Sequence, residues 1–198
     1  MGQTNRLLRI GLMLEYLTLS WNVAGVVILA IAAFKAHSVA LAAFGLDSLI
    51  EIGASIVVVW QLRGADPNRR SLALRRISVA FFTLAIYMLV QSTIVQLSQA
   101  RPEQSAGGIV WLILTLLAML ALAFGKDRIG AKLSNLVLTT EARVTLVDAY
   151  LAATVLLGLV LNAAFGWWWA DPIAALVIVF YGFKEGLHAW SEGAAIDT

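Results

Sequence analysis

The chain has 198 residues, of which 61% are hydrophobic and only 13% are charged. Soluble domains carry about 25% charged residues, so this composition excludes an ordinary water-soluble fold and predicts a chain that lies in lipid. The formal net charge is only +2, and in a membrane protein a basic excess records orientation rather than nucleic-acid binding. The chain has no cysteine, which excludes disulfides and thiolate metal sites.

Six apolar stretches follow one another along the chain, and a helix that crosses a bilayer needs about 20 such residues. The first stretch is longer than the apolar core of a cleavable signal peptide, so we interpret it as a membrane helix. The predicted helices cover approximately residues 8–34, 39–62, 77–97, 109–124, 138–165 and 172–190. We therefore predict an all-α polytopic membrane protein, with residues 1–198 forming one transmembrane domain and no soluble domain. Asp171 is expected to cap the last helix, with Pro172 in its first turn.

The basic residues predict an orientation for these helices. Of the 14 Lys and Arg residues, only Lys35 and Arg101 fall on the side opposite the N-terminus. Basic loops stay in the cytoplasm, so both termini are expected there. The sequence thus predicts a multi-pass protein of the cell inner membrane.

Two acids interrupt the second helix, in the stretch "FGLDSLIEIGAS". Asp47 and Glu51 are four residues apart and share one helix face, and Glu51 lies roughly 17 Å from either helix end. An acid at that depth costs at least about 2.5 kcal/mol. We assign every Lys and Arg to a loop or a helix end, so no internal ion pair is expected. The acids are then either protonated and hydrogen-bonded, or they share a cation from outside the protein.

Other acids point toward the same interior. Asp148 lies near mid-depth in the fifth predicted helix, and Glu15 in the first serves either packing or an ion path. Glu141 is close to Arg143 at the inner mouth, which favours a solvated or paired helix end. Several oxygen ligands of negative charge suit a divalent cation, and the same acids can exchange protons as the metal leaves.

Two segments resemble the cation diffusion facilitator family of divalent-metal transporters. The segment "SVALAAFGLDSLIEIGAS" is similar to the family's second helix, and "VTLVDAYLAATVLLGLVLNAAFGWWWADPIAALVIV" to its fifth helix, outer turn and sixth helix. The resemblance implies that Asp47, Glu51 and Asp148 are metal ligands. It also implies proton-coupled efflux by alternating access, with zinc as the leading metal. Manganese, ferrous iron and cobalt stay open because the three ligands are all carboxylates.

The chain departs from the family pattern in two places. Val144 stands where the family usually has His or Asp, so a water, Thr145, Glu141 or Glu15 is needed to complete the site. Only "SEGAAIDT" follows the sixth predicted helix, so the family's cytoplasmic metal-binding domain is not expected. A homodimer through the membrane helices remains open.

Two other functions fit the same acids. One is a membrane sensor or partner subunit that binds metal without transporting it, and the other is a proton-coupled carrier of a small organic cation. The sequence has no nucleophile–base pair and no phosphate loop, so we expect neither an enzyme nor a prosthetic group. The expected partners are a divalent metal ion, protons and the lipid bilayer, with no nucleic acid.

Overall fold

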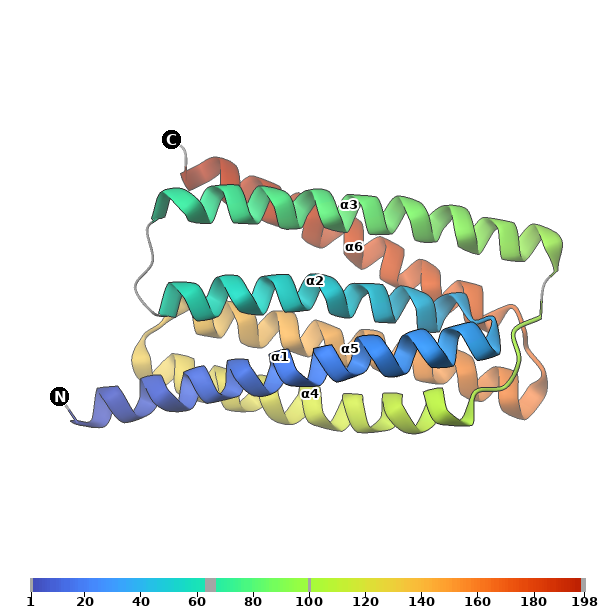
Figure 1. Cartoon of the computed structure of the whole chain (residues 1–198), viewed down its shortest axis with the longest axis horizontal. Coiled ribbons are helices and arrows are strands. Elements are labelled where there is room, and N and C mark those ends of the chain that lie inside the picture. Colours follow the sequence, from blue (N-terminus) through green and yellow to red (C-terminus); the bar gives the residue numbers. More distant parts are fainter. Residues whose placement is uncertain (1, 63–66, 100, 197–198) are drawn as a thin grey trace.

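Six helices make up the structure, a computed structural model that describes residues 2–62, 67–99 and 101–196 (Figure 1). They are α1 (Gly2–Ala36), α2 (Val39–Leu62), α3 (Pro67–Ser98), α4 (Ala106–Leu133), α5 (Leu136–Phe165) and α6 (Ala170–Ile196). No strand occurs in the described ranges. The predicted all-α fold with six helices is confirmed.

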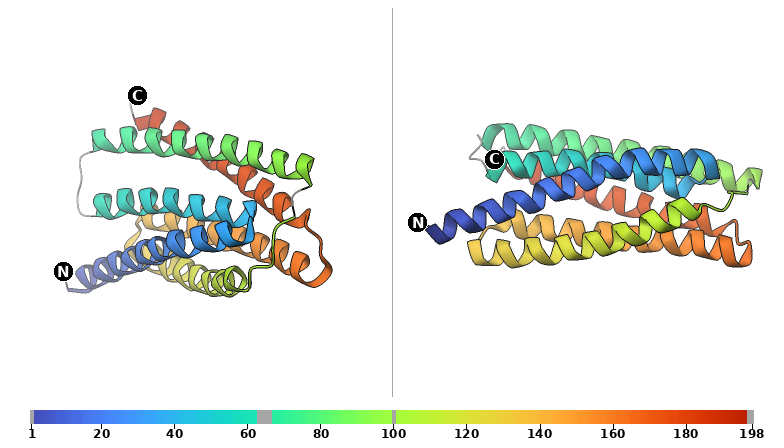
Figure 2. Two further views of the ribbon diagram at one scale, coloured as in Figure 1. Left: turned by 45° about the vertical axis from the view of Figure 1, so that its right-hand side comes forward. Right: turned by 60° about the horizontal axis from the view of Figure 1, so that its bottom comes forward.

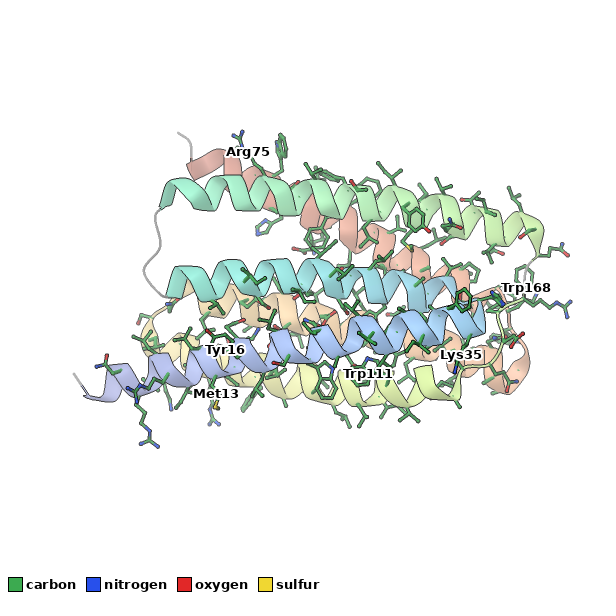
Figure 3. All side chains as sticks on the ribbon, in the orientation of Figure 1. Met13, Tyr16, Lys35, Arg75, Trp111 and Trp168 are labelled. Atoms are coloured by element: carbon green, nitrogen blue, oxygen red, sulfur yellow. The ribbon has the colours of Figure 1, made fainter. Side chains whose placement is uncertain are left out.

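The helices form two groups. α1, α2, α4 and α5 pack into one bundle, and α6 crosses beside it while packing along α3 (Figures 1 and 2). Both termini lie at one end of the molecule (Figure 1). Lys35 and Trp168 lie at the other end (Figure 3). That the end with the termini is cytoplasmic stays a prediction.

The helices have the length and composition of membrane spans. α1, α3, α4, α5 and α6 each contain a described segment long and apolar enough to cross a bilayer. α2 has 24 residues, and Asp47 and Glu51 are its only charged ones; at about 1.5 Å per residue it is roughly 36 Å long. Large apolar side chains such as Phe34, Leu97 and Phe180 lie exposed on the outside. Such a surface belongs in hydrocarbon rather than water.

The fourth helix is longer than its apolar stretch. We predicted that it ends at about residue 124, but α4 continues to Leu133 and is capped by Ser134, whose φ is 50°. The prediction was wrong because charged residues end an apolar window without ending a helix: Lys, Arg, Ala and Leu are good helix formers. As a result, Lys126 lies inside the bundle.

Asp171 caps a different helix from the one that we predicted. It lies within the first turn of α6, and its carboxylate accepts hydrogen bonds from the backbone N–H groups of Val39, at 2.9 Å, and Ala40, at 3.2 Å. The Ser38 hydroxyl donates a further bond to it. An acid at a helix N-terminus satisfies orphan donors and complements the helix dipole. Asp171 therefore joins α6 to the start of α2.

Replacing Asp171 by Ala should destabilise the fold. The variant leaves three buried donors unpaired, and an unsatisfied buried group costs about 1–3 kcal/mol. We expect a clearly lower midpoint of thermal unfolding in detergent. Glu103→Ala, an exposed acid near the same end of the molecule, is the control and should unfold like wild type. Equal midpoints for the two variants would contradict the capping role.

The lack of native cysteine allows a direct test of orientation. Ala106 and Ala131 are both exposed and lie near opposite ends of α4. In spheroplasts, a membrane-impermeant maleimide should label Ala106→Cys at once and Ala131→Cys only after lysis. The reverse pattern would place the termini outside.

Candidate cation site

Three of the predicted site residues line one small cavity, whose wall is formed by α2, α3, α5 and α6. Asp47 and Glu51 reach it from α2 and Asp148 reaches it from α5. All three are buried, with 5%, 4% and 3% of their surface exposed. The cavity offers about 20 Å³ to the centre of a water molecule, and roughly 10–15 Å³ by that measure holds one water. The space therefore fits one water or one ion.

One of the acids that line this cavity has an unpaired carboxylate oxygen among the described residues. Asp148 Oδ1 is buried and has no hydrogen-bond partner within the described part of the chain. Glu51 lies within electrostatic reach of both Asp47 and Asp148. Like charges repel strongly in surroundings of low dielectric constant, and a buried charge requires a counter-charge. A cation or protons in the cavity would relieve both costs.

The carboxylates do not yet converge on one point. Across residues 2–62, 67–99 and 101–196, no group of three or more His, Asp or Glu side chains is arranged to hold a metal ion as it stands. Asp47 and Glu51 line the cavity from α2, and Asp148 lines it from α5. An ion bound between them would have to draw their oxygens inward.

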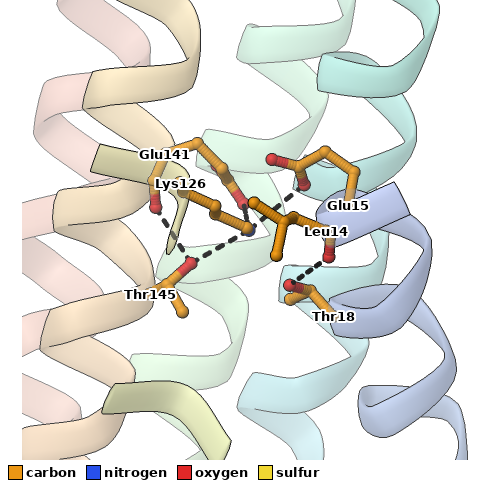
Figure 4. Close-up of polar contacts among 6 residues, drawn as sticks. All are labelled: Leu14, Glu15, Thr18, Lys126, Glu141 and Thr145. Carbon is orange, nitrogen blue, oxygen red and sulfur yellow. Dashed lines mark hydrogen bonds and ion pairs between the residues drawn. The ribbon is translucent and has the colours of Figure 1, made fainter. Parts of the chain in front are cut away.

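A second set of acids surrounds a buried ammonium group (Figure 4). Lys126 Nζ lies 3.2 Å from Glu15 Oε2, 3.3 Å from Glu141 Oε1 and 3.1 Å from Thr145 Oγ1. All four residues are buried, and they come from α1, α4 and α5. We call them the Lys126 cluster. The cluster gives the ammonium three oxygen partners and joins three helices.

The Lys126 cluster overturns the expectation that no Lys or Arg lies in the interior. The residues of α4 showed the signal, because Thr115, Met119, Ala123 and Lys126 follow one another at intervals of three and four and are all buried. Such spacing marks one helix face. Once α4 is continued past residue 124, this face carries Lys126 into the bundle.

The three residues considered as further metal ligands all contact this ammonium. Glu141 was expected to be solvated or paired with Arg143, but it is buried and pairs with Lys126, whereas Arg143 is exposed. Glu15 also pairs with Lys126, through Oε2. The Thr145 hydroxyl donates to the Glu141 backbone oxygen at 2.9 Å and accepts from Lys126. Their oxygens hold a protein cation.

A fourth acid lines the cavity that the sequence analysis did not single out. Glu185 reaches it from α6 and lies within electrostatic reach of Asp47. In the sequence it follows Lys184 near the end of the chain, where charged residues are common at a membrane helix end. Its signal was the spacing of four from Tyr181, which also lines the cavity.

A larger, open vestibule borders the cavity on the side of α5 and α6. It offers about 830 Å³ by the same measure. Its lining residues are Arg143, Val144, Val147, Lys184, Glu185, Leu187, His188 and Ser191. Val144, Val147 and Glu185 line the small cavity as well. Because Arg143 is near the start of α5 and Ser191 near the end of α6, the vestibule lies toward the end that carries the termini.

The model of the cation efflux transmembrane domain matches residues 16–196. The chain belongs to the cation efflux family. The matched segment includes all six helices in whole or in part and every acid described above except Glu15, which directly precedes it. The resemblance to cation diffusion facilitators is thereby confirmed, and with it the prediction of a multi-pass membrane protein. Membership points to a transporter rather than an enzyme.

Two curated relatives are similar to the chain. An uncharacterized transporter of Synechocystis sp. is 25% identical over 78% of this chain and 54% of its own length. The cation-efflux pump FieF of Shewanella oneidensis is 33% identical over 43% of this chain and 28% of its own length. The chain thus spans about half or less of the relatives that it matches.

Removing the buried ammonium should unfold the bundle readily. Lys126→Met leaves Glu15 and Glu141 without their cation, and breaking a buried pair costs about 3–5 kcal/mol. We expect a large drop in the thermal midpoint in detergent. Lys132→Met, an exposed lysine on the same helix, should change little.

A compensated variant separates charge balance from side-chain packing. In Lys126→Met combined with Glu15→Gln and Glu141→Gln, no unpaired charge remains, so most of the lost stability should return. If Lys126→Met alone is as stable as Lys132→Met, the ammonium does not hold the helices together.

Proposed function

We propose that this chain exports a divalent metal cation across the membrane, binding it in the cavity between α2 and α5. One observation carries the proposal: three buried carboxylates line a space of ion size, and no other described residue supplies a hydrogen-bond donor or ion pair to them. Asp47, Glu51 and Asp148 would be the ligands. Family membership supports the same reading.

The Lys126 cluster strengthens this proposal. The ammonium forms its hydrogen bonds with Glu15, Glu141 and Thr145, so its binding capacity is used by two carboxylates and a hydroxyl that do not line the cavity. The cavity acids thus remain available for a cation from outside the protein. Their depth in lipid makes such a counter-charge necessary whenever they are ionised.

Zinc is the first metal to test, because the resemblance implies it. The three side chains offer only oxygen atoms, a donor set that equally suits manganese, ferrous iron or cobalt. Acids must lose their protons before they bind metal, so binding should release protons and weaken at lower pH. We propose that this exchange couples proton entry to metal exit, through a protein that acts as a monomer or as a dimer joined by membrane helices.

The size of the cavity argues against the organic-cation alternative. Phe81 and Tyr181 do line the wall, as such a carrier would need, but about 20 Å³ holds a bare ion or a water and not an alkylammonium. The sensor alternative makes the same binding prediction and is separated from transport only by flux.

Neutralising the cavity acids should abolish transport. In proteoliposomes loaded with a metal-sensitive dye, wild type should carry Zn²⁺ or Mn²⁺ at a rate above that of empty vesicles. Asp148→Asn and Glu51→Gln keep the side-chain volume and remove the charge, so flux should fall at least about tenfold, as for weakened metal sites in general. Glu103→Gln should retain the wild-type rate.

The outcomes distinguish the candidate functions. Binding of metal without flux in wild type would support the sensor. Flux that persists in both cavity variants would contradict the assignment of the site.

A further inference from the structure

Glu185 stands at the junction of the cavity and the vestibule. It is the only acid among the residues that line both spaces, and it is partly exposed where Asp47, Glu51 and Asp148 are buried. It also lies within electrostatic reach of Asp47. Glu185 therefore lines both the vestibule, through which a cation can enter, and the cavity in which it would bind.

Position 144 leaves a gap in the ligand set of α5. Val144 precedes Asp148 by one turn and lines the same cavity, but its side chain offers no donor atom. Asp148 lines the same space, and its buried Oδ1 has no partner among the described residues. A cation here therefore meets an incomplete set of oxygens from α2 and α5 alone.

We propose that Glu185 is the fourth carboxylate of the cation site and supplies from α6 the ligand that Val144 cannot. The inference rests on the proposed function and adds to it a third helix and a specific residue. With four carboxylates and no nitrogen or sulfur donor, the site is all-oxygen. Such a set suits hard or borderline divalent cations.

The packing of α6 gives Glu185 a fixed position. A Cβ at Gly186 would lie 2.9 Å from the Phe82 ring, and the Gly186 backbone oxygen accepts a hydrogen bond from the Ser78 hydroxyl at 2.6 Å. Through these contacts, the face of α6 that carries Gly186 packs closely against α3. At the far end Asp171 joins α6 to α2. Glu185 is therefore held by a helix anchored at two levels.

The vestibule explains why the fourth ligand is partly exposed. Arg143 and Lys184 also line it and repel cations, and Lys184 Nζ lies 5.6 Å above the centre of the Tyr181 ring. Glu185 is the one acid on this wall. A cation that enters the vestibule thus binds first at Glu185 and is passed inward to Asp47, its neighbour in the cavity.

Calorimetry on the whole purified chain tests this assignment, with Zn²⁺ and Mn²⁺ as probes. Glu185→Gln should weaken binding at least about tenfold, the loss typical of a disturbed metal site. Glu185→Asp keeps the carboxylate, and Glu185→Gln with Val144→Asp moves it to α5. At least one of these two should recover most of the affinity. Glu103→Gln is the control, and circular dichroism and thermal unfolding confirm that each variant folds.

Each result decides between the claims. If Glu185→Gln binds within threefold of wild type while Asp148→Asn does not bind, Glu185 is no ligand and the proposed function stands. A loss in Glu185→Gln that neither carboxylate variant recovers also overturns the inference, since the role is then structural. If wild type binds neither metal, the proposed function itself fails.

Discussion

The structure depends on one buried ammonium group. Lys126 carries its charge into a bundle surrounded by apolar, outward-facing side chains, where no water can solvate it. In lipid, helices gain little from hydrophobic burial against one another, and polar contacts and close packing hold them. The contacts of Lys126 with Glu15 and Glu141 join α1, α4 and α5. These contacts also mean that Glu15 and Glu141 are already paired with a cation of the protein.

This pairing divides the interior acids by role. Glu15 and Glu141 hold the protein's own cation, whereas Asp47, Glu51 and Asp148 surround a space of ion size. The two sets are close enough to affect each other, because Glu51 lies within electrostatic reach of Lys126 and Glu141. Because Glu15 and Glu141 already balance the charge of Lys126, an arriving cation would be balanced by the acids of the cavity. The protein thus contains one internal ion pair and a separate set of acids that can pair with a cation from outside.

The second helix could be predicted almost completely from the sequence, whereas the fourth extends well beyond its predicted end. Asp47 and Glu51 stand out because nothing else in their apolar stretch is charged, and the spacing of four fixes their common face. Lys126 and Glu185 were missed because each sits among charged residues where an apolar window ends. A charged side chain near a helix end is either solvated or buried, and composition alone does not distinguish the two cases. The two cases can be distinguished only by the helix face on which the residue lies, and that face is known only once the helix is known to continue past the apolar stretch.

A metal-bound structure tests the central claim most directly. Crystals or frozen grids of the full chain with Zn²⁺ or Mn²⁺ would locate the ion by anomalous scattering or by density. The account predicts one ion in the cavity, with oxygens of Asp47, Glu51 and Asp148 drawn to about 2.0–2.2 Å from zinc and Lys126 still bound to Glu15 and Glu141. An ion held by Glu15 and Glu141, with Lys126 displaced, would contradict the division of the acids on which the account rests.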